Sequence, residues 1–143
     1  MNLGMGVNPL RVVLDTNILI SAIHFGGKPR TILNLVEDSN SAIKAIISPV
    51  LLAELAETFT KKFNFDQEHI EEIKSTIEDG FELVYPKKEL HVVKDKDDNR
   101  VLEAAVEGNC EYIITGDKDL LQLKVYRGIK IVTPEHFLEN FRD

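Results

Sequence analysis

The sequence predicts an α/β fold with a central, mostly parallel sheet covered by helices on both faces. Three observations support this prediction. The chain has 143 residues, which corresponds to about one domain. Its content of 43% hydrophobic and 29% charged residues is that of an ordinary globular protein. Short apolar runs alternate along the chain with longer helix-like stretches, which is the pattern of a parallel sheet with crossover helices.

Five short runs are the predicted strands. They cover residues 11–14, 45–47, 81–84, 112–115 and 129–133. Four of them are rich in Val and Ile and apolar on both alternating faces, as expected for strands that are covered on both sides. The run 81–84 alternates between apolar and polar residues, and it is therefore predicted to be an edge strand.

Five helices are predicted from capping and breaking residues between these runs. Their starts or stops are marked by Pro29, by Ser48–Pro49, by Asp66 and Gly80, by Gly108 after residues 99–107, and by Thr133–Pro134.

The ends of the sequence and its composition set further expectations. Residues 1–10 lack periodicity and are predicted to be a flexible N-terminal tail, followed by one domain over residues 11–143. No window approaches 18 apolar residues and no signal-peptide pattern is visible, so we expect a cytoplasmic protein without a membrane span. The single cysteine, Cys110, cannot form a disulfide framework or a zinc site alone.

The net charge of −7 argues against a broad basic surface for nucleic acid. It leaves room for a local site in which clustered carboxylates bind a divalent cation, because the cation then dominates the local charge. The positions of the acidic residues therefore matter more than their number.

Two short polar segments that contain aspartate follow predicted strands, namely residues 15–17 (DTN) and 117–119 (DKD). Asp15 follows the strand 11–14, and Asp117 follows the strand 112–115 after one glycine. In open α/β sheets the functional crevice lies beyond the carboxyl ends of the strands, so these positions favour a shared site. The alternative is that each aspartate merely caps the next helix.

Asp98 and Glu54 complete a set of four acids at four successive strand-to-helix junctions. Asp98 precedes the apolar stripe of the helix 99–107 at helical spacing, so its carboxylate is predicted to face the packed side; the alternatives are a helix cap or a solvated charge run. Glu54 lies near the start of the second predicted helix and could equally be a surface residue. Carboxylates brought together in this way favour Mg²⁺ or Mn²⁺, which prefer oxygen ligands.

Other chemistries lack their residues. The sequence contains no G-x-S-x-G elbow, no complete P-loop, no Cys–His constellation in a strand context and no histidine pair at metal-ligand spacing. A phosphatase or receiver site is disfavoured because Asn17 stands where a second aspartate is expected and Thr133–Pro134 stands where a lysine is expected.

Taken together, the motifs resemble those of the PIN-domain family. The segments that carry the resemblance are residues 15–22 (DTNILISA), 97–105 (DDNRVLEAA), 112–121 (YIITGDKDLL) and 131–138 (IVTPEHFL). The resemblance covers residues 11–140 and is greatest to PIN proteins regarded as toxin components of toxin–antitoxin modules. One departure is Lys96, where this group often has a proline.

The resemblance implies a three-layer α/β/α fold and a ribonuclease that depends on Mg²⁺ or Mn²⁺. It also implies an RNA substrate, a homodimer and an antitoxin partner. The implied catalytic acids are Asp15, Glu54, Asp98 and Asp117. Asp15, Asp98 and Asp117 would hold the metal, with Glu54 as a further ligand or an orienter of water. The supporting polar residues would be Asn17, Thr115 and Asp119.

Basic residues near the rim of this site are candidates for contacts to the RNA backbone. They are Lys28, Arg30, Arg100 and Lys118. The competing hypothesis is a non-catalytic α/β module for binding or dimerisation, in which the same acids are only helix caps.

Overall fold

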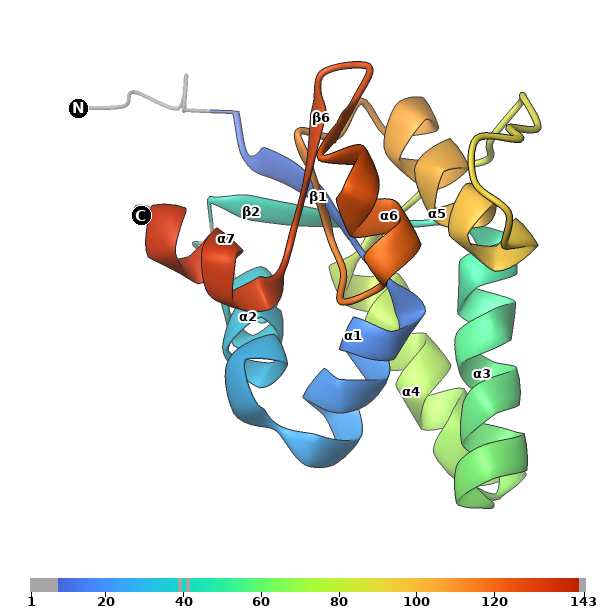
Figure 1. Cartoon of the computed structure of the whole chain (residues 1–143). Helices are drawn as coiled ribbons and strands as arrows, with labels where there is room; N and C mark the ends of the chain where they lie inside the picture. Colours follow the sequence, from blue (N-terminus) through green and yellow to red (C-terminus); the bar gives the residue numbers. More distant parts are fainter. Residues whose placement is uncertain (1–7, 39, 41, 142–143) are drawn as a thin grey trace.

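A six-stranded sheet forms the centre of the computed structural model, which describes residues 8–38, 40 and 42–141 (Figure 1). The strand order is β3-β2-β1-β4-β6-β5. The strands are β1 (Leu10–Leu14), β2 (Ile43–Ile47), β3 (Glu82–Leu83), β4 (Tyr112–Ile114), β5 (Val125–Tyr126) and β6 (Ile129–Val132). All neighbouring strands are parallel except β5, which pairs antiparallel with β6.

The mostly parallel sheet and the edge position of β3 confirm the sequence-based predictions. Strand β1 begins one residue earlier than predicted, at Leu10. Most of the predicted flexible tail, residues 1–7, lies outside the described residues. Strand β5 was not predicted. It forms a hairpin with β6 through a two-residue turn, where Arg127 and Gly128 both have positive φ angles (50° and 82°), as such tight turns require.

Helices follow the strands at nearly every connection. They are α1 (Thr16–Ile20), the π-helical turn η1 (Ser21–Phe25), α2 (Gly27–Glu37), α3 (Pro49–Phe63), α4 (Gln67–Gly80), α5 (Lys96–Glu107), α6 (Lys118–Leu123) and α7 (Pro134–Asn140). The predicted caps Ser48, Asp66 and Thr133 each accept a hydrogen bond from the first turn of their helix. Helix α6 was not predicted as a separate element, and α5 begins three residues earlier than expected.

The order of the strands places the helices in two layers. From β1 through β2 to β3 the chain moves along the sheet in one direction, and between β3 and β4 it returns past β1. Because such crossovers are right-handed, α2 and α5 cover opposite faces of the sheet (Figure 1). Helix α5 packs on β1, β2 and β4, whereas α2 packs on β2 and on α7. This is the three-layer α/β/α arrangement.

The core is formed by the inner strands and the apolar faces of these helices. Val12, Ala45, Ile113 and Leu102 have no solvent exposure. Within the described part of the chain, no helix has both the length and the apolar content needed to cross a membrane.

Gly108 sets the distance between α5 and the sheet. It ends α5, as predicted, and a Cβ atom at this position would lie 2.7 Å from Cγ2 of Ile46 and 3.1 Å from the backbone oxygen of Ala104. Ile46 is a buried, β-branched residue of β2, so its methyl group has little freedom to move.

We predict that Gly108→Ala lowers the free energy of unfolding by about 1–3 kcal/mol, because overpacking forces α5 away from β2. Urea unfolding measures this change. The matched control is Gly80→Ala, since no atom lies within 4 Å of a Cβ added to this last residue of α4. Equal stability of the two variants would contradict the close-packing role of Gly108.

Candidate active site

The candidate site lies between the carboxyl ends of β1 and β4. From β1 the chain proceeds to β2 on one side, and from β4 it proceeds to β6 on the other, so the sheet reverses direction between these two neighbouring strands. Ligands of open α/β sheets bind at such a switch point. Asp15 follows β1 directly, and Asp117 follows β4 after two loop residues, of which Thr115 is the first.

Thr115 connects these two strand ends. Its side chain is fully buried, and its hydroxyl donates a hydrogen bond of 2.6 Å to Oδ2 of Asp15. The same hydroxyl oxygen accepts a 3.0 Å hydrogen bond from the backbone N–H of Asp117. The backbone N–H of Asp15 also donates to the carbonyl oxygen of Ile114 at 3.0 Å. Thr115 therefore fixes the loops after β1 and β4 relative to one another.

The helix-cap alternative applies to only one of the three aspartates. Asp117 does cap α6, because its Oδ1 accepts hydrogen bonds from the backbone N–H groups of Asp119 (2.9 Å) and Leu120 (3.1 Å). Asp15 precedes α1, but its carboxylate is held by Thr115 and makes no cap hydrogen bond within the described chain. Helix α5 is capped by Asp95, not by Asp98.

Asp98 is the most constrained acid of the site. Its side chain projects from the first turn of α5, and the residue is only 7% exposed. The Oδ2 atom is buried and has no hydrogen-bond partner among the described residues. Burying a carboxylate oxygen without a partner costs free energy. Binding of a cation or a proton at this carboxylate would lower that cost.

Asp98 belongs to a group of three neighbouring carboxylates. Asp98, Asp117 and Asp119 each offer one oxygen, and these oxygens lie within 4.8 Å of one another. Only oxygen donors are present in this group, as hard divalent cations prefer. The residues therefore fit an ion such as Mg²⁺ or Mn²⁺. Asp15 and Glu54 lie outside this group of three.

The electrostatics of the cluster favour protonation when no cation is present. Burial raises the pKa of Asp98 to about 7, and the neighbouring carboxyl group of Asp117 adds to the shift through its negative charge. Burial also raises the pKa of Asp15, although the hydrogen bond from Thr115 opposes this change. The charge of Asp117 contributes to the shift of Asp15, so the two carboxylates interact across the switch point.

Glu54 lies in a separate part of the same edge. Its Oε1 accepts a 2.6 Å hydrogen bond from the hydroxyl of Thr16, which follows Asp15. Burial raises the pKa of Glu54 to about 7, with a smaller contribution from the neighbouring carboxyl of Asp97. A hollow of about 260 Å³ is lined by Glu54, Asp97 and Arg100.

The remaining predicted polar residues lie on the other side of the cluster. A hollow of about 540 Å³ is lined by Asn17 and Ser21 of the β1 side and by Asp117, Lys118 and Asp119 of the β4 side. Asn17 is exposed at this surface. The hollow gives a ligand direct access to two of the three clustered carboxylates.

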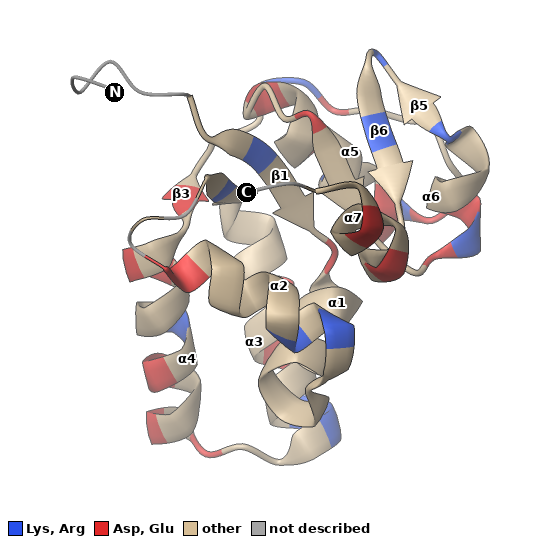
Figure 2. Cartoon of the chain, turned by 90° about the vertical axis from the view of Figure 1, so that its left-hand side faces the viewer, with Lys and Arg blue, Asp and Glu red and all other residues tan. Residues whose placement is uncertain are grey.

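The four basic candidates are not gathered at one place. Lys118 lines the hollow beside Asp117. Lys28 and Arg30 lie in the first turn of α2, where Arg30 pairs with Glu37 at 3.4 Å. Arg100 of α5 pairs with Glu103 at 2.6 Å. Acidic residues likewise occur on several elements, among them α4 and α7, so the cluster is one local concentration on a broadly acidic chain (Figure 2).

Known proteins share both the sequence pattern and the fold of this chain. The family model of the PIN domain matches residues 11–119. The chain belongs to the PIN-domain family. An uncharacterized protein of Methanocaldococcus jannaschii is 31% identical to this PIN-domain chain over 145 residues, with 92% of each sequence aligned.

A solved structure supports the fold assignment. The crystal structure of VapBC2 from Rickettsia felis, bound to a DNA fragment from its promoter, superposes on this PIN-domain chain with a TM-score of 0.56 and 17% identity. The match covers 85% of this chain and 97% of the other.

Sequence reasoning missed three contributors to the site. Asp119 was expected only as a supporting residue, yet it is one of the three clustered carboxylates. Asp97 was not among the predicted site residues, yet its carboxyl group neighbours Glu54. The contact of Thr16 with Glu54 joins residues 38 positions apart, and no local pattern in the sequence indicates it.

The raised pKa of Asp98 predicts how stability changes with pH in the metal-free protein. The folded chain binds a proton more readily than the unfolded chain between the ordinary value of 3.8 and about 7, so stability falls as pH rises through this range. We expect Asp98→Asn to unfold at a higher temperature than wild type at pH 8 in EDTA, by about 2–4 °C for each kcal/mol gained. At pH 5 the difference should shrink.

Calorimetric unfolding at the two pH values measures this effect. Asp79→Asn is the control, because Asp79 is exposed in the last turn of α4, before β3, and therefore at the opposite edge of the sheet. A lower unfolding temperature for Asp98→Asn than for wild type at pH 8 would contradict the conclusion that the buried, ionised carboxylate of Asp98 destabilises the metal-free protein.

Proposed function

We propose that this PIN-domain protein is a divalent-metal-dependent ribonuclease and the toxin component of a toxin–antitoxin module. The observation that carries the proposal is the approach of carboxylate oxygens of Asp98, Asp117 and Asp119 to within 4.8 Å of one another. Asp98 also has a buried Oδ2 atom with no hydrogen-bond partner among the described residues. A cluster at the switch point of the sheet, open to solvent through an adjoining hollow, suits binding of a phosphodiester.

Asp98, Asp117 and Asp119 would hold the cation, with Asp15 beside them. When bound, the ion supplies charge stabilisation at phosphoryl oxygens and makes an attacking water molecule more acidic. Thr115 positions Asp15 and the loop of Asp117 through its two hydrogen bonds. Glu54, with a pKa of about 7, suits the acceptance of a proton from water near neutral pH.

The proposed partners follow from the same family membership. The VapBC2 structure holds that protein on a fragment of promoter DNA. For this chain we propose an antitoxin protein that covers the acidic site, a homodimeric assembly and a cytoplasmic location. The RNA backbone would contact Lys118 at the hollow beside Asp117. Lys28, Arg30 and Arg100 lie on other parts of the surface and would contact more distant nucleotides.

A non-catalytic binding module is the second candidate, and the cap role of Asp117 favours it. Titration calorimetry with Mn²⁺ separates the two functions. A ribonuclease of this kind takes up the ion in a carboxylate-dependent way, whereas a module with aspartate caps does not.

Incubation of the purified protein with mixed RNA, with and without Mn²⁺, tests the proposed activity. We expect metal-dependent cleavage in wild type and in the control Asp79→Asn. Loss of a residue that only supports a metal ligand reduces activity by roughly 10- to 100-fold. Because Asp98 is proposed to be a ligand itself, cleavage by Asp98→Asn should fall by more than this. Undiminished cleavage in a cleanly purified Asp98→Asn protein would refute the assignment.

Thr115→Val tests the positioning role of the buried hydroxyl. The substitution keeps the shape of the side chain and removes both hydrogen bonds at the strand ends. We expect Mn²⁺ affinity and RNA cleavage to fall by roughly 10- to 100-fold. Thr60→Val, on the exposed face of α3, is the matched control. The role would be excluded if both variants bound Mn²⁺ equally well.

A further inference from the structure

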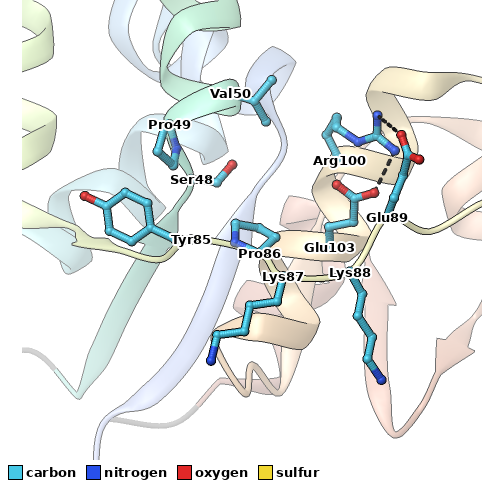
Figure 3. Close-up of a pocket in the computed structure, with 10 residues that line it drawn as sticks. All are labelled: Ser48, Pro49, Val50, Tyr85, Pro86, Lys87, Lys88, Glu89, Arg100 and Glu103. Atoms are coloured by element: carbon cyan, nitrogen blue, oxygen red, sulfur yellow. Dashed lines mark hydrogen bonds and ion pairs between the residues drawn. The ribbon is translucent and has the colours of Figure 1, made fainter.

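A third surface hollow lies on the same edge of the sheet, over the ends of β2 and β3 (Figure 3). Its cavity volume is about 440 Å³. We call it the Tyr85 pocket. It is lined by Ser48 and Val50 at the start of α3, by residues 85–89 after β3, and by Arg100 and Glu103 of α5. Because Ser48 and Tyr85 follow parallel strands, they lie at the carboxyl edge that also carries the acidic cluster.

The Tyr85 pocket adjoins the hollow that contains Glu54, one of the four predicted catalytic acids. The smaller hollow lined by Glu54 and Asp97 shares Val50 and Arg100 with the Tyr85 pocket. A chain-like ligand can therefore extend from Glu54 and Asp97 across these two shared residues to Tyr85.

The aromatic ring of Tyr85 is available to a ligand. The residue is 66% exposed, and no other aromatic ring packs against it in the described part of the chain. By contrast, Tyr112 packs edge-on against Phe137. An exposed aromatic face next to a charged groove is the kind of platform on which nucleobases stack.

The charge of the Tyr85 pocket favours an anionic ligand. Arg100 is compensated by Glu103 at 2.6 Å and by Glu89 at 3.9 Å. Among the described residues no carboxylate pairs with the ammonium groups of Lys87 and Lys88, whose side chains extend away from these pairs (Figure 3). The lining of the Tyr85 pocket thus contains three basic and two acidic side chains, and the ammonium groups of Lys87 and Lys88 are suited to contacts with phosphates.

We propose that the Tyr85 pocket binds a nucleotide of single-stranded RNA next to the cleaved phosphodiester. The base stacks on Tyr85, and the backbone phosphates lie against Lys87 and Lys88. This inference rests on the proposed ribonuclease function and specifies its substrate class, because a base within a duplex is not free to stack on a side chain. The positive charges of Lys87 and Lys88 lie beside the exposed ring of Tyr85. This combination favours a nucleotide, which has both a phosphate and a base, over a segment of a partner protein.

Binding of a dye-labelled single-stranded RNA hexamer to the Asp98→Asn protein tests this inference without cleavage. Fluorescence anisotropy should show that adding Tyr85→Ala weakens binding by about 5- to 150-fold, whereas Tyr85→Phe retains it. An abasic hexamer should bind equally to the proteins with and without Tyr85→Ala. Lys87→Ala with Lys88→Ala should reduce the slope of log affinity against log salt by about 0.7 for each RNA phosphate that a lysine no longer neutralises.

Matched controls are Phe25→Ala, a 71% exposed aromatic of η1, and Lys61→Ala with Lys62→Ala in the last turn of α3. Both should leave hexamer affinity unchanged. The inference is overturned if the parent protein does not bind the hexamer, if Tyr85→Ala binds it as tightly as the parent, or if Tyr85→Ala weakens the abasic hexamer equally. If Tyr85-dependent binding is found but wild type cleaves no RNA with Mn²⁺, only the ribonuclease proposal fails.

Discussion

Mutual repulsion among carboxylates at one edge of the sheet is the constraint that the rest of the site must satisfy. Oxygens of Asp98, Asp117 and Asp119 lie within 4.8 Å of one another. Burial raises the pKa of Asp98, and the negative charge of Asp117 adds to this shift. The fold opposes this repulsion with contacts that do not involve the carboxylate groups of the three acids. Pairing of β1 with β4, the buried hydroxyl of Thr115 and the apolar packing of α5 hold the backbone in place.

Strand order explains why acids far apart in the sequence meet. Asp15 and Asp117 are separated by about a hundred residues, yet β1 and β4 are neighbours and both end at the same edge. Helix α5 crosses the sheet between them and brings Asp98 to that edge with its first turn. The surroundings of the carboxylates differ. The carboxylate of Asp15 accepts a hydrogen bond from Thr115, whereas Oδ2 of Asp98 has no hydrogen-bond donor among the described residues.

The elements that were predicted correctly are those whose signal is local. Apolar runs indicated the inner strands, and helical periodicity placed Asp98 on the buried side of α5. Strand β5 has two residues and α6 has six, so neither is long enough to show a period. Helix α5 begins early because Asp95 caps it. Asp97 and Asp98 lie in the same charged run and are equally plausible caps by residue type, so the sequence alone did not identify the first residue of the helix. The pairing of Glu54 with Asp97 arises from the packing of α3 near α5, which no local pattern encodes.

The hydrogen bond between Thr115 and Asp15 spans 100 residues, and this separation has a consequence for biosynthesis. A chain emerging from the ribosome carries Asp15 early, but it cannot assemble the acidic pocket until β4 and the following loop have also emerged. Partially synthesised or C-terminally degraded chains that lack residues 112–119 therefore carry no assembled pocket. The acidic pocket can therefore assemble only after residues 112–119 have been synthesised.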